Sequence, residues 1–187
     1  MATKIYIDQG HNPVNPNAGA EGNGLREQDL VYNIGIELAE LLENNGNFEV
    51  RLSRPTPTTQ IGTSNNSSLR ARVNDANSWG ADYFISLHTN ASSIPSATGS
   101  EAFAFSEPSA AFSLGEDILR RMTEATGLPN RGMKTRPGLY VLRKTNMPAI
   151  LLELGFITNA RDAELMLNSP QLFARGIYQG ILDYLGL

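Results

Sequence analysis

The chain has 187 residues, 41% of them hydrophobic, and this length favours one domain with a well-buried core. Its net charge is -4 with scattered basic residues, and no apolar run is long enough to cross a bilayer; we therefore expect a soluble protein that binds neither nucleic acid nor membrane. The absence of cysteine excludes disulfides, cysteine nucleophiles and thiolate metal sites, and leaves the compartment open.

The chain begins with a short predicted strand over residues 4–8. The residues before it contain no signal-peptide core, so either the protein leaves the cell by another route or the chain is an excised domain. A loop over residues 9–24, rich in Gly, Asn and Pro, follows the strand and contains His11. Its glycines lack the G-x-G-x-x-G spacing of a dinucleotide site, so we interpret it as a flexible wall of a site.

The middle of the chain alternates between helical and extended patterns. Apolar residues recur at helical spacing from Leu30 to Leu41, and Gly46 supplies a helix stop. The run that ends in His88 consists of Tyr, Phe, Ile and Leu, as expected for a strand buried on both faces. The predicted elements are a helix over residues 27–45, a strand over 48–53, a long loop over 54–67, a helix over 68–80 and a strand over 83–90.

The last part of the chain continues the alternation. It is predicted to contain a strand over residues 100–105, a helix over 112–126, strands over 139–143 and 149–153, and helices over 160–167 and 170–185. Strands that alternate with helices predict an α/β fold: a single domain with a mostly parallel twisted sheet and helices on both faces.

Both histidines of the chain lie just past the ends of predicted strands. Ligands of open α/β sheets gather outside the carboxyl ends of the strands, and Glu27, in the first turn of the helix after the first loop, belongs to the same edge. His11, Glu27 and His88 thus make a His2Glu set, the ligand set of hydrolytic zinc sites. The structural alternatives are that His88 caps a core strand and that Glu27 complements the helix dipole.

Glu153 is a carboxylate within the apolar run at residues 149–156. Such a group is costly to bury unless it is paired, hydrogen-bonded or protonated, so its position indicates a functional role. Burial would raise its pKa and suit it to accept a proton from water and pass it to a leaving amine, whereas a nearby metal would lower the pKa. The alternative is that Glu153 points outward from an exposed edge strand.

Three further polar residues are candidates with equally ordinary explanations. Asp8 is a candidate carboxylate that orients the metal ligand His11 without binding the metal itself, or else it caps a turn. Asn90 either contacts substrate or holds the loop after His88. Arg131 either binds a substrate carboxylate or the developing oxyanion, or forms a surface salt bridge.

Six short motifs, in order, resemble those of the zinc-dependent N-acetylmuramoyl-L-alanine amidases of the amidase-3 type. They are residues 7–11 (IDQGH), 24–30 (GLREQDL), 86–91 (SLHTNA), 130–134 (NRGMK), 139–143 (LYVLR) and 152–159 (LELGFITN). The resemblance implies a phosphorylase/hydrolase-like fold and one catalytic amidase domain over residues 1–187. It also implies cleavage, by zinc-activated water, of the amide between the lactyl group of N-acetylmuramic acid and L-alanine in peptidoglycan.

By these motifs, His11, Glu27 and His88 correspond to the ligands of one Zn2+ per chain, and Glu153 to the catalytic glutamate. Gln9 departs from the family, which often has a small residue or proline there, and this affects the detail of the loop. Some relatives carry a regulatory helix after the histidine that corresponds to His88. Residues 89–100 are too few for such a helix, so we expect an open site.

The resemblance also sets expectations for partners and location. We expect a monomer that acts on peptidoglycan at the bacterial cell wall, as the catalytic domain of an autolysin or endolysin, after secretion or release on lysis. Because a negative domain gains little from attraction to an often negative wall, a separate wall-binding module is expected in the full-length protein. Alternatives are a zinc peptidase that acts on the stem peptide, a wall-binding module without catalysis, and a sugar- or phosphate-binding protein.

Overall fold

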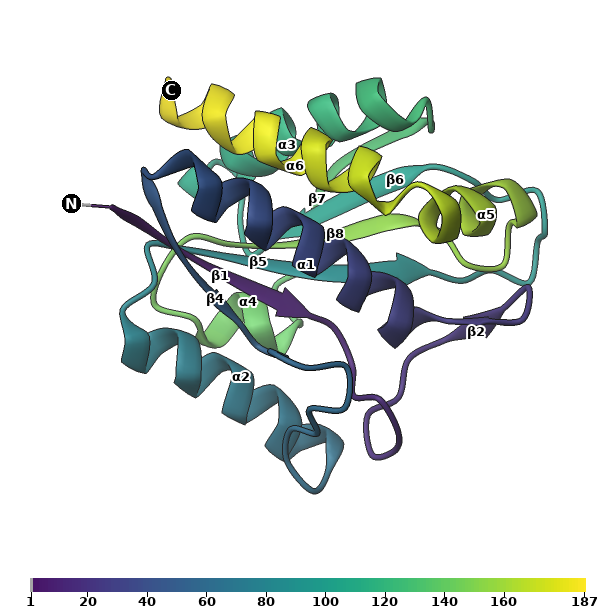
Figure 1. Ribbon diagram of the computed structural model, residues 1–187, viewed down its shortest axis with the longest axis horizontal. Helices are drawn as coiled ribbons and strands as arrows, with labels where there is room; N and C mark the ends of the chain where they lie inside the picture. The colour runs from purple at the N-terminus through teal and green to yellow at the C-terminus, as the bar shows by residue number, and fades with distance from the viewer. Residues whose placement is uncertain (1) are drawn as a thin grey trace.

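A six-stranded sheet lies between two layers of helices in the computed structural model, which describes residues 2–187 (Figure 1). The strand order is β4-β1-β5-β8-β6-β7, and only the contact between β6 and β8 is antiparallel. The strands are β1 (Thr3–Gln9), β4 (Phe48–Leu52), β5 (Tyr83–Asn90), β6 (Ser100–Ala104), β7 (Asn130–Thr135) and β8 (Ala149–Phe156), and β2 (Glu21–Gly22) and β3 (Leu25–Arg26) form a separate small hairpin. The predicted fold class is confirmed.

Helices cover both faces of the sheet. One face carries α1 (Glu27–Asn45), α3 (Ala110–Thr126) and α6 (Pro170–Leu185), which pack on side chains such as Ile85 and Leu152. The other face carries α2 (Asn65–Trp79) and α4 (Tyr140–Lys144), which pack on Phe84 and Leu151, and α5 (Ala160–Asn168) follows β8 (Figure 1). Neighbouring residues of β5 and β8 thus enter opposite layers of the core, as the twofold period of a strand requires.

Two sequence predictions need correction. Residues 139–143 were predicted as a strand but fall mostly within α4, whose Val141 and Leu142 are buried against the sheet. A short apolar run fits a buried helical turn as well as a strand, so its periodicity does not decide between them. β7 was not predicted, because it is a largely polar, exposed strand that pairs with one neighbour only, at the edge of the sheet.

The start of α2 is set by a capping motif. Ser64 accepts a hydrogen bond from the backbone N–H of Ser67, whose side chain in turn accepts one from Ser64. The helix therefore begins three residues before the predicted position. Within residues 2–187, no helix combines the length and the apolar composition that a bilayer span requires.

Candidate metal centre

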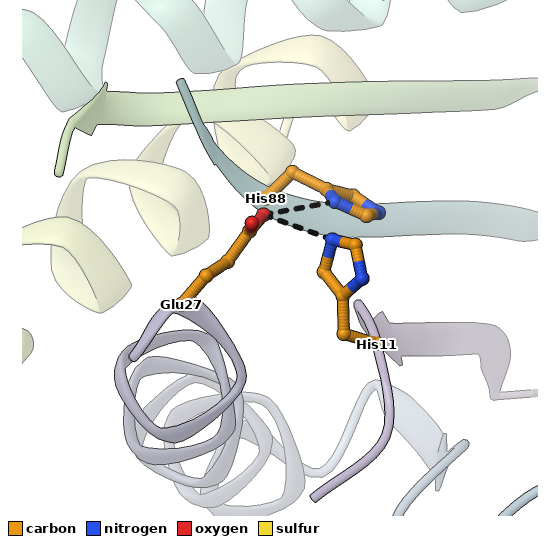
Figure 2. A group of neighbouring side chains, drawn as sticks. All are labelled: His11, Glu27 and His88. Carbon is orange, nitrogen blue, oxygen red and sulfur yellow. Dashed lines mark hydrogen bonds and ion pairs between the residues drawn. The ribbon is translucent and has the colours of Figure 1, made fainter. Parts of the chain in front are cut away.

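The carboxyl ends of β1 and β5 lie side by side, because these strands pair in parallel from Ile5 and Tyr83 to Gln9 and Leu87. His11 comes two residues after the end of β1, and His88 lies near the end of β5. The hairpin formed by β2 and β3 leads directly into α1, whose first residue is Glu27. The predicted convergence of these three side chains at one edge of the sheet is confirmed (Figure 2).

The carboxylate of Glu27 faces both imidazoles. Its Oε1 atom lies 3.2 Å from Nε2 of His11 and 3.1 Å from Nδ1 of His88 (Figure 2). The rings meet edge to face, with centroids 4.8 Å apart. Neighbouring ligand atoms of a tetrahedral zinc ion with bonds of 2.0–2.2 Å are about 3.3 Å apart. The two spacings to Glu27 match this value, and the ligand atoms of all three side chains lie within 4.8 Å of one another, so the set can hold a metal ion such as zinc.

The carboxylate of Glu27 is held from the other side by backbone amides. Thr89 N–H donates to its Oε1 and Ala20 N–H to its Oε2, each at 2.8 Å. Burial would raise the pKa of Glu27, but the hydrogen bonds to His11 and His88 outweigh it, and the pKa falls well below its usual range. Glu27 is thus an ionised carboxylate at a buried site, as a cation ligand must be.

His88 does not cap the strand through its ring. Its Nδ1 faces the carboxylate of Glu27 and not a backbone carbonyl. Burial would lower the pKa of His88, but its hydrogen bond to Glu27 and the attraction of that charge outweigh burial and raise the pKa. The pair therefore attracts positive charge, from a proton or from a metal ion.

Two glycines allow the loop over residues 9–24 to close around the three donors. A Cβ on Gly10 would lie 2.5 Å from Cε1 of His88, and a Cβ on Gly19 would lie 2.8 Å from Oε2 of Glu27. Both distances are shorter than van der Waals contact, so any other residue would displace a donor side chain. This segment therefore packs on the donors and is a wall of the site, as predicted.

His11 has a left-handed backbone conformation, with φ of 66°, which is unfavourable for a residue with a Cβ. Arg72, a fully buried side chain of α2, holds this turn: one guanidinium nitrogen, Nη1, donates to the carbonyl of Gln9 at 2.7 Å, and the other, Nη2, donates to the carbonyl of His11. The His11 ring contacts Glu27 through Nε2, whereas its buried Nδ1 has no hydrogen-bond partner among residues 2–187.

Asp8 does not orient the His11 ring directly, so that hypothesis is wrong in its simple form. Its carboxylate accepts a hydrogen bond from Arg72 at 2.5 Å and another from the hydroxyl of Ser86 at 2.8 Å. Burial would raise the pKa of Asp8, but the charge of Arg72 and these hydrogen bonds lower it. Asp8 therefore acts on His11 only through Arg72, which bridges the two residues.

Glu153 lies in β8 and is paired on both sides, with His88 on β5 and with Glu101 on β6. The alternative of an exposed edge strand is wrong, because β8 is central in the sheet. Burial raises the pKa of Glu153 to about 7, helped by the charges of Glu27 and Glu101 and opposed by His88. Its Oε2 atom is buried and has no hydrogen-bond partner in the described part of the chain.

Asn90 and Arg131 both contact Glu101, a residue that the sequence analysis missed. The amide of Asn90 donates to Oε1 of Glu101 at 2.7 Å, and Nε of Arg131 lies 3.4 Å from Oε2. Lys134 also pairs with this carboxylate. Glu101 carries the same signal as Glu153, an acid in an otherwise apolar strand, and could have been found by it. The salt bridge expected for Arg131 is thus present; contact with substrate remains a hypothesis for both residues.

The connection after His88 contains no helix over residues 91–99. The side chains of His11 and His88 are each 21% exposed, whereas that of Glu27 is only 4% exposed. This agrees with the expectation of an open site.

Fold and site together define an α/β domain with a donor set typical of hydrolytic zinc enzymes. The sequence profile of the N-acetylmuramoyl-L-alanine amidases of the amidase-3 type matches residues 5–183, and the chain belongs to this family. It is 38% identical over 182 residues to the N-acetylmuramoyl-L-alanine amidase CwlM of Bacillus licheniformis, a match that covers 95% of this chain and 67% of the relative.

Other similar proteins have different names and lengths. The N-acetylmuramoyl-L-alanine amidase LytC of Bacillus subtilis is 36% identical, and the match covers 96% of this chain but 35% of LytC. The endolysin of Bacillus phage SPP1 is 31% identical, and the match covers 100% of this chain and 68% of the endolysin. A crystal structure of an N-acetylmuramoyl-L-alanine amidase from Clostridium difficile 630 superposes with a TM-score of 0.88 at 30% identity, covering 99% and 97% of the chains.

Proposed function

We propose that residues 1–187 form a single catalytic domain that hydrolyses the amide between the lactyl group of N-acetylmuramic acid and L-alanine in peptidoglycan. Family membership supports the reaction, since the related proteins are named for it. The observation that carries the proposal for this chain is the pairing of His88 with Glu153 across β5 and β8, because it sets a buried carboxylate beside the three metal donors.

In this proposal, His11, Glu27 and His88 hold one zinc ion. Two neutral imidazoles and one carboxylate leave a bound zinc with net positive charge, and zinc so bound polarises a carbonyl oxygen and makes a water molecule more acidic. The amides of Thr89 and Ala20 hold the Glu27 carboxylate in place, so the position of this ligand does not depend on the metal.

Glu153 is the proposed general base and acid. Neither carboxylate oxygen of Glu153 accepts a hydrogen bond within residues 2–187, and only Oε2 is fully buried, so Oε1 has a lone pair that the attacking water can reach. Glu153 accepts a proton from that water as the oxygen bonds to the lactyl carbonyl carbon. As the C–N bond breaks, Glu153 returns a proton to the alanine nitrogen, and the products are a lactyl carboxylate and a free amino group.

We further propose that the domain acts as a monomer at the bacterial cell wall. The chain spans about two thirds of the length of CwlM and about a third of that of LytC, and some relatives are thus longer. A separate wall-binding module beside the catalytic domain is consistent with this difference and with the net charge of -4. Both autolytic and phage lytic roles are compatible with the site, since the relatives include an endolysin.

The products of wall digestion test the proposal. Mass spectrometry of purified walls treated with the protein should detect new L-alanine amino termini and intact stem peptides. Cut stem peptides with intact lactyl amides would instead identify a zinc peptidase. Sedimentation with walls without any bond cleavage would identify a binding module, and the absence of stoichiometric zinc at neutral pH would favour a sugar- or phosphate-binding protein.

A further inference from the structure

Three cations lie on the side of Glu153 away from His88, in a protein whose net charge is -4. We call them the basic strip: Arg131 and Lys134 on β7, and Arg136, which follows β7. Lys134 pairs with Phe103 in the parallel ladder between β6 and β7. Because side chains two residues apart share a face of a strand, Lys134 and Glu101 lie on the same face as Phe103. The ladder between β6 and β8 places Glu153 on that face as well.

Only part of this positive charge is neutralised within the protein. Arg131 and Lys134 both pair with Glu101, so one carboxylate serves two cations. Arg136 is exposed and forms no ion pair with any carboxylate in the described residues. The strip therefore keeps an excess of positive charge next to the proposed general base.

The guanidinium of Arg136 is nonetheless held in a defined place. Its central carbon lies 5.3 Å from the centroid of the Phe103 ring, a distance typical of a cation–π contact. Its backbone N–H donates to the carbonyl of Ala104 at 2.9 Å, which anchors the residue to the end of β6. The guanidinium makes no side-chain hydrogen bond within the described residues, so its N–H groups are available, and a guanidinium edge matches the two oxygens of a carboxylate.

The position of Phe103 sets the distance between this cation and the proposed reaction centre. Glu101 is the ladder partner of Glu153, and Phe103 is the partner of Leu151, so the Phe103 ring lies two residues below Glu153 on the same face. Two residues of a strand span about 6.6 Å, and because Phe103 lies on the neighbouring strand, its diagonal separation from Glu153 is roughly 7–8 Å. An extended peptide advances about 3.3–3.6 Å per residue, so a carboxylate on the residue after L-alanine lies on the order of 6 Å from the scissile nitrogen.

We propose that Arg136 binds a free carboxylate on the residue that follows L-alanine in the stem peptide and thereby determines specificity. The inference rests on the proposed function, since it takes the scissile amide to lie beside Glu153. It predicts a preference for walls in which this carboxyl group is free over walls in which it is a carboxamide. The guanidinium of Arg136 supplies the bidentate partner, and its cation–π contact with Phe103 limits where the guanidinium lies.

The test compares two soluble muramoyl peptides that differ only in this group, N-acetylmuramoyl-L-alanyl-D-isoglutamate and its isoglutamine counterpart. The zinc-loaded wild type should cleave the carboxylate with kcat/KM about tenfold higher, as expected for a charge-assisted hydrogen bond. Arg136→Gln should remove the preference by slowing only the carboxylate substrate. Arg136→Lys should keep part of the preference, because the positive charge remains. The rest should be lost, because lysine lacks the two parallel N–H groups of a guanidinium.

Arg175→Gln is the matched control, because Arg175 is an exposed arginine of α6, on the opposite face of the sheet. It removes the same charge and should leave the preference unchanged.

Equal rates of the wild type on the two substrates, or an equal loss on both substrates in Arg136→Gln, would overturn the inference. If the wild type cleaves neither substrate, the proposed function fails separately. Calorimetric binding of L-alanyl-D-isoglutamate and L-alanyl-D-isoglutamine then decides the role of Arg136 by the same comparison of variants.

Discussion

The three metal donors and Glu153 occupy neighbouring positions but are held in different ways. His11 lies in a loop, Glu27 in the first turn of a helix, and His88 at a strand end, whereas Glu153 lies within a strand that is paired on both sides. The donors depend on specific polar contacts and on glycines that permit close approach. The position of Glu153 is set by the ladder, and its chemistry by the charges around it. Substitutions of residues that support the three proposed metal ligands should therefore alter zinc affinity. Substitutions around Glu153 should alter the rate of hydrolysis.

His88→Ala should have the largest effect. It removes a metal ligand and also the partner of Glu27, so stoichiometric zinc and activity should be lost together. Metal analysis after dialysis and release of L-alanine amino termini are the two measurements. Retention of one zinc per chain in this variant would show that the metal is held elsewhere. The thermal unfolding of the metal-free protein controls for misfolding.

Glu153→Ala should separate chemistry from metal binding. The variant should keep one zinc per chain and lose activity by about 10²–10⁴-fold, the usual contribution of a positioned proton-transfer group. The loss should appear in kcat, because the base acts in the chemical step. A variant that still released muramic acid ends at the wild-type rate would show that another group is the base.

Arg72→Lys tests the support of the His11 turn. The positive charge that faces Asp8 is retained, but the two guanidinium nitrogens that donate to the carbonyls of Gln9 and His11 are lost. Zinc affinity, measured by competition with a chelator, should fall about 10–100-fold, as for other residues that support metal ligands.

Arg54→Lys is the control for that variant. Arg54 is equally buried, but it donates to the carbonyls of Gln28 and Pro57 and contacts none of the three donors. Its replacement should lower the free energy of unfolding with little effect on zinc affinity. Equal zinc affinity in the two variants would remove the proposed role of Arg72.

The last prediction concerns the pH dependence of the metal-free protein. Because the folded pKa of Glu153 is about 7 and its ordinary value is 4.5, folding favours the protonated carboxyl. Its contribution to the free energy of unfolding is complete below pH 4.5 and is lost as pH rises through 7. The side chain in Glu153→Gln stays neutral. The free energy of unfolding of this variant should therefore exceed that of the wild type by on the order of 3 kcal/mol at pH 8 and by little at pH 4. Denaturant unfolding at both pH values measures this; a constant difference would contradict the burial of an unpartnered carboxylate.

The sequence was sufficient to predict that the four candidate residues lie close together, because their signals are local. His11 and His88 follow apolar strands, and Glu153 interrupts an apolar run. Arg72 had no comparable signal, since its partners Asp8 and His11 lie 64 and 61 residues away along the chain. It occupies the buried side of α2, next to Val73, where a helical pattern alone indicates an apolar contact.

The errors in the fold have a similar cause. β7 pairs with one neighbour and is largely polar, so neither alternation nor an apolar run marks it. Its absence from the prediction also hid the basic strip, because the positions of Lys134 and Arg136 relative to Glu153 follow from strand order. Strand order is a property of the tertiary fold that the local pattern of β6 or β8 does not specify.

Digestion of purified cell walls before and after metal removal tests the central claim most directly. The wild type should release L-alanine amino termini, lose this activity after treatment with a chelator, and regain it when about one equivalent of Zn2+ per chain is added. Glu153→Ala, treated in the same way, should rebind zinc without regaining activity. Undiminished release of L-alanine amino termini by a preparation shown to contain no metal would contradict the proposed role of His11, Glu27 and His88.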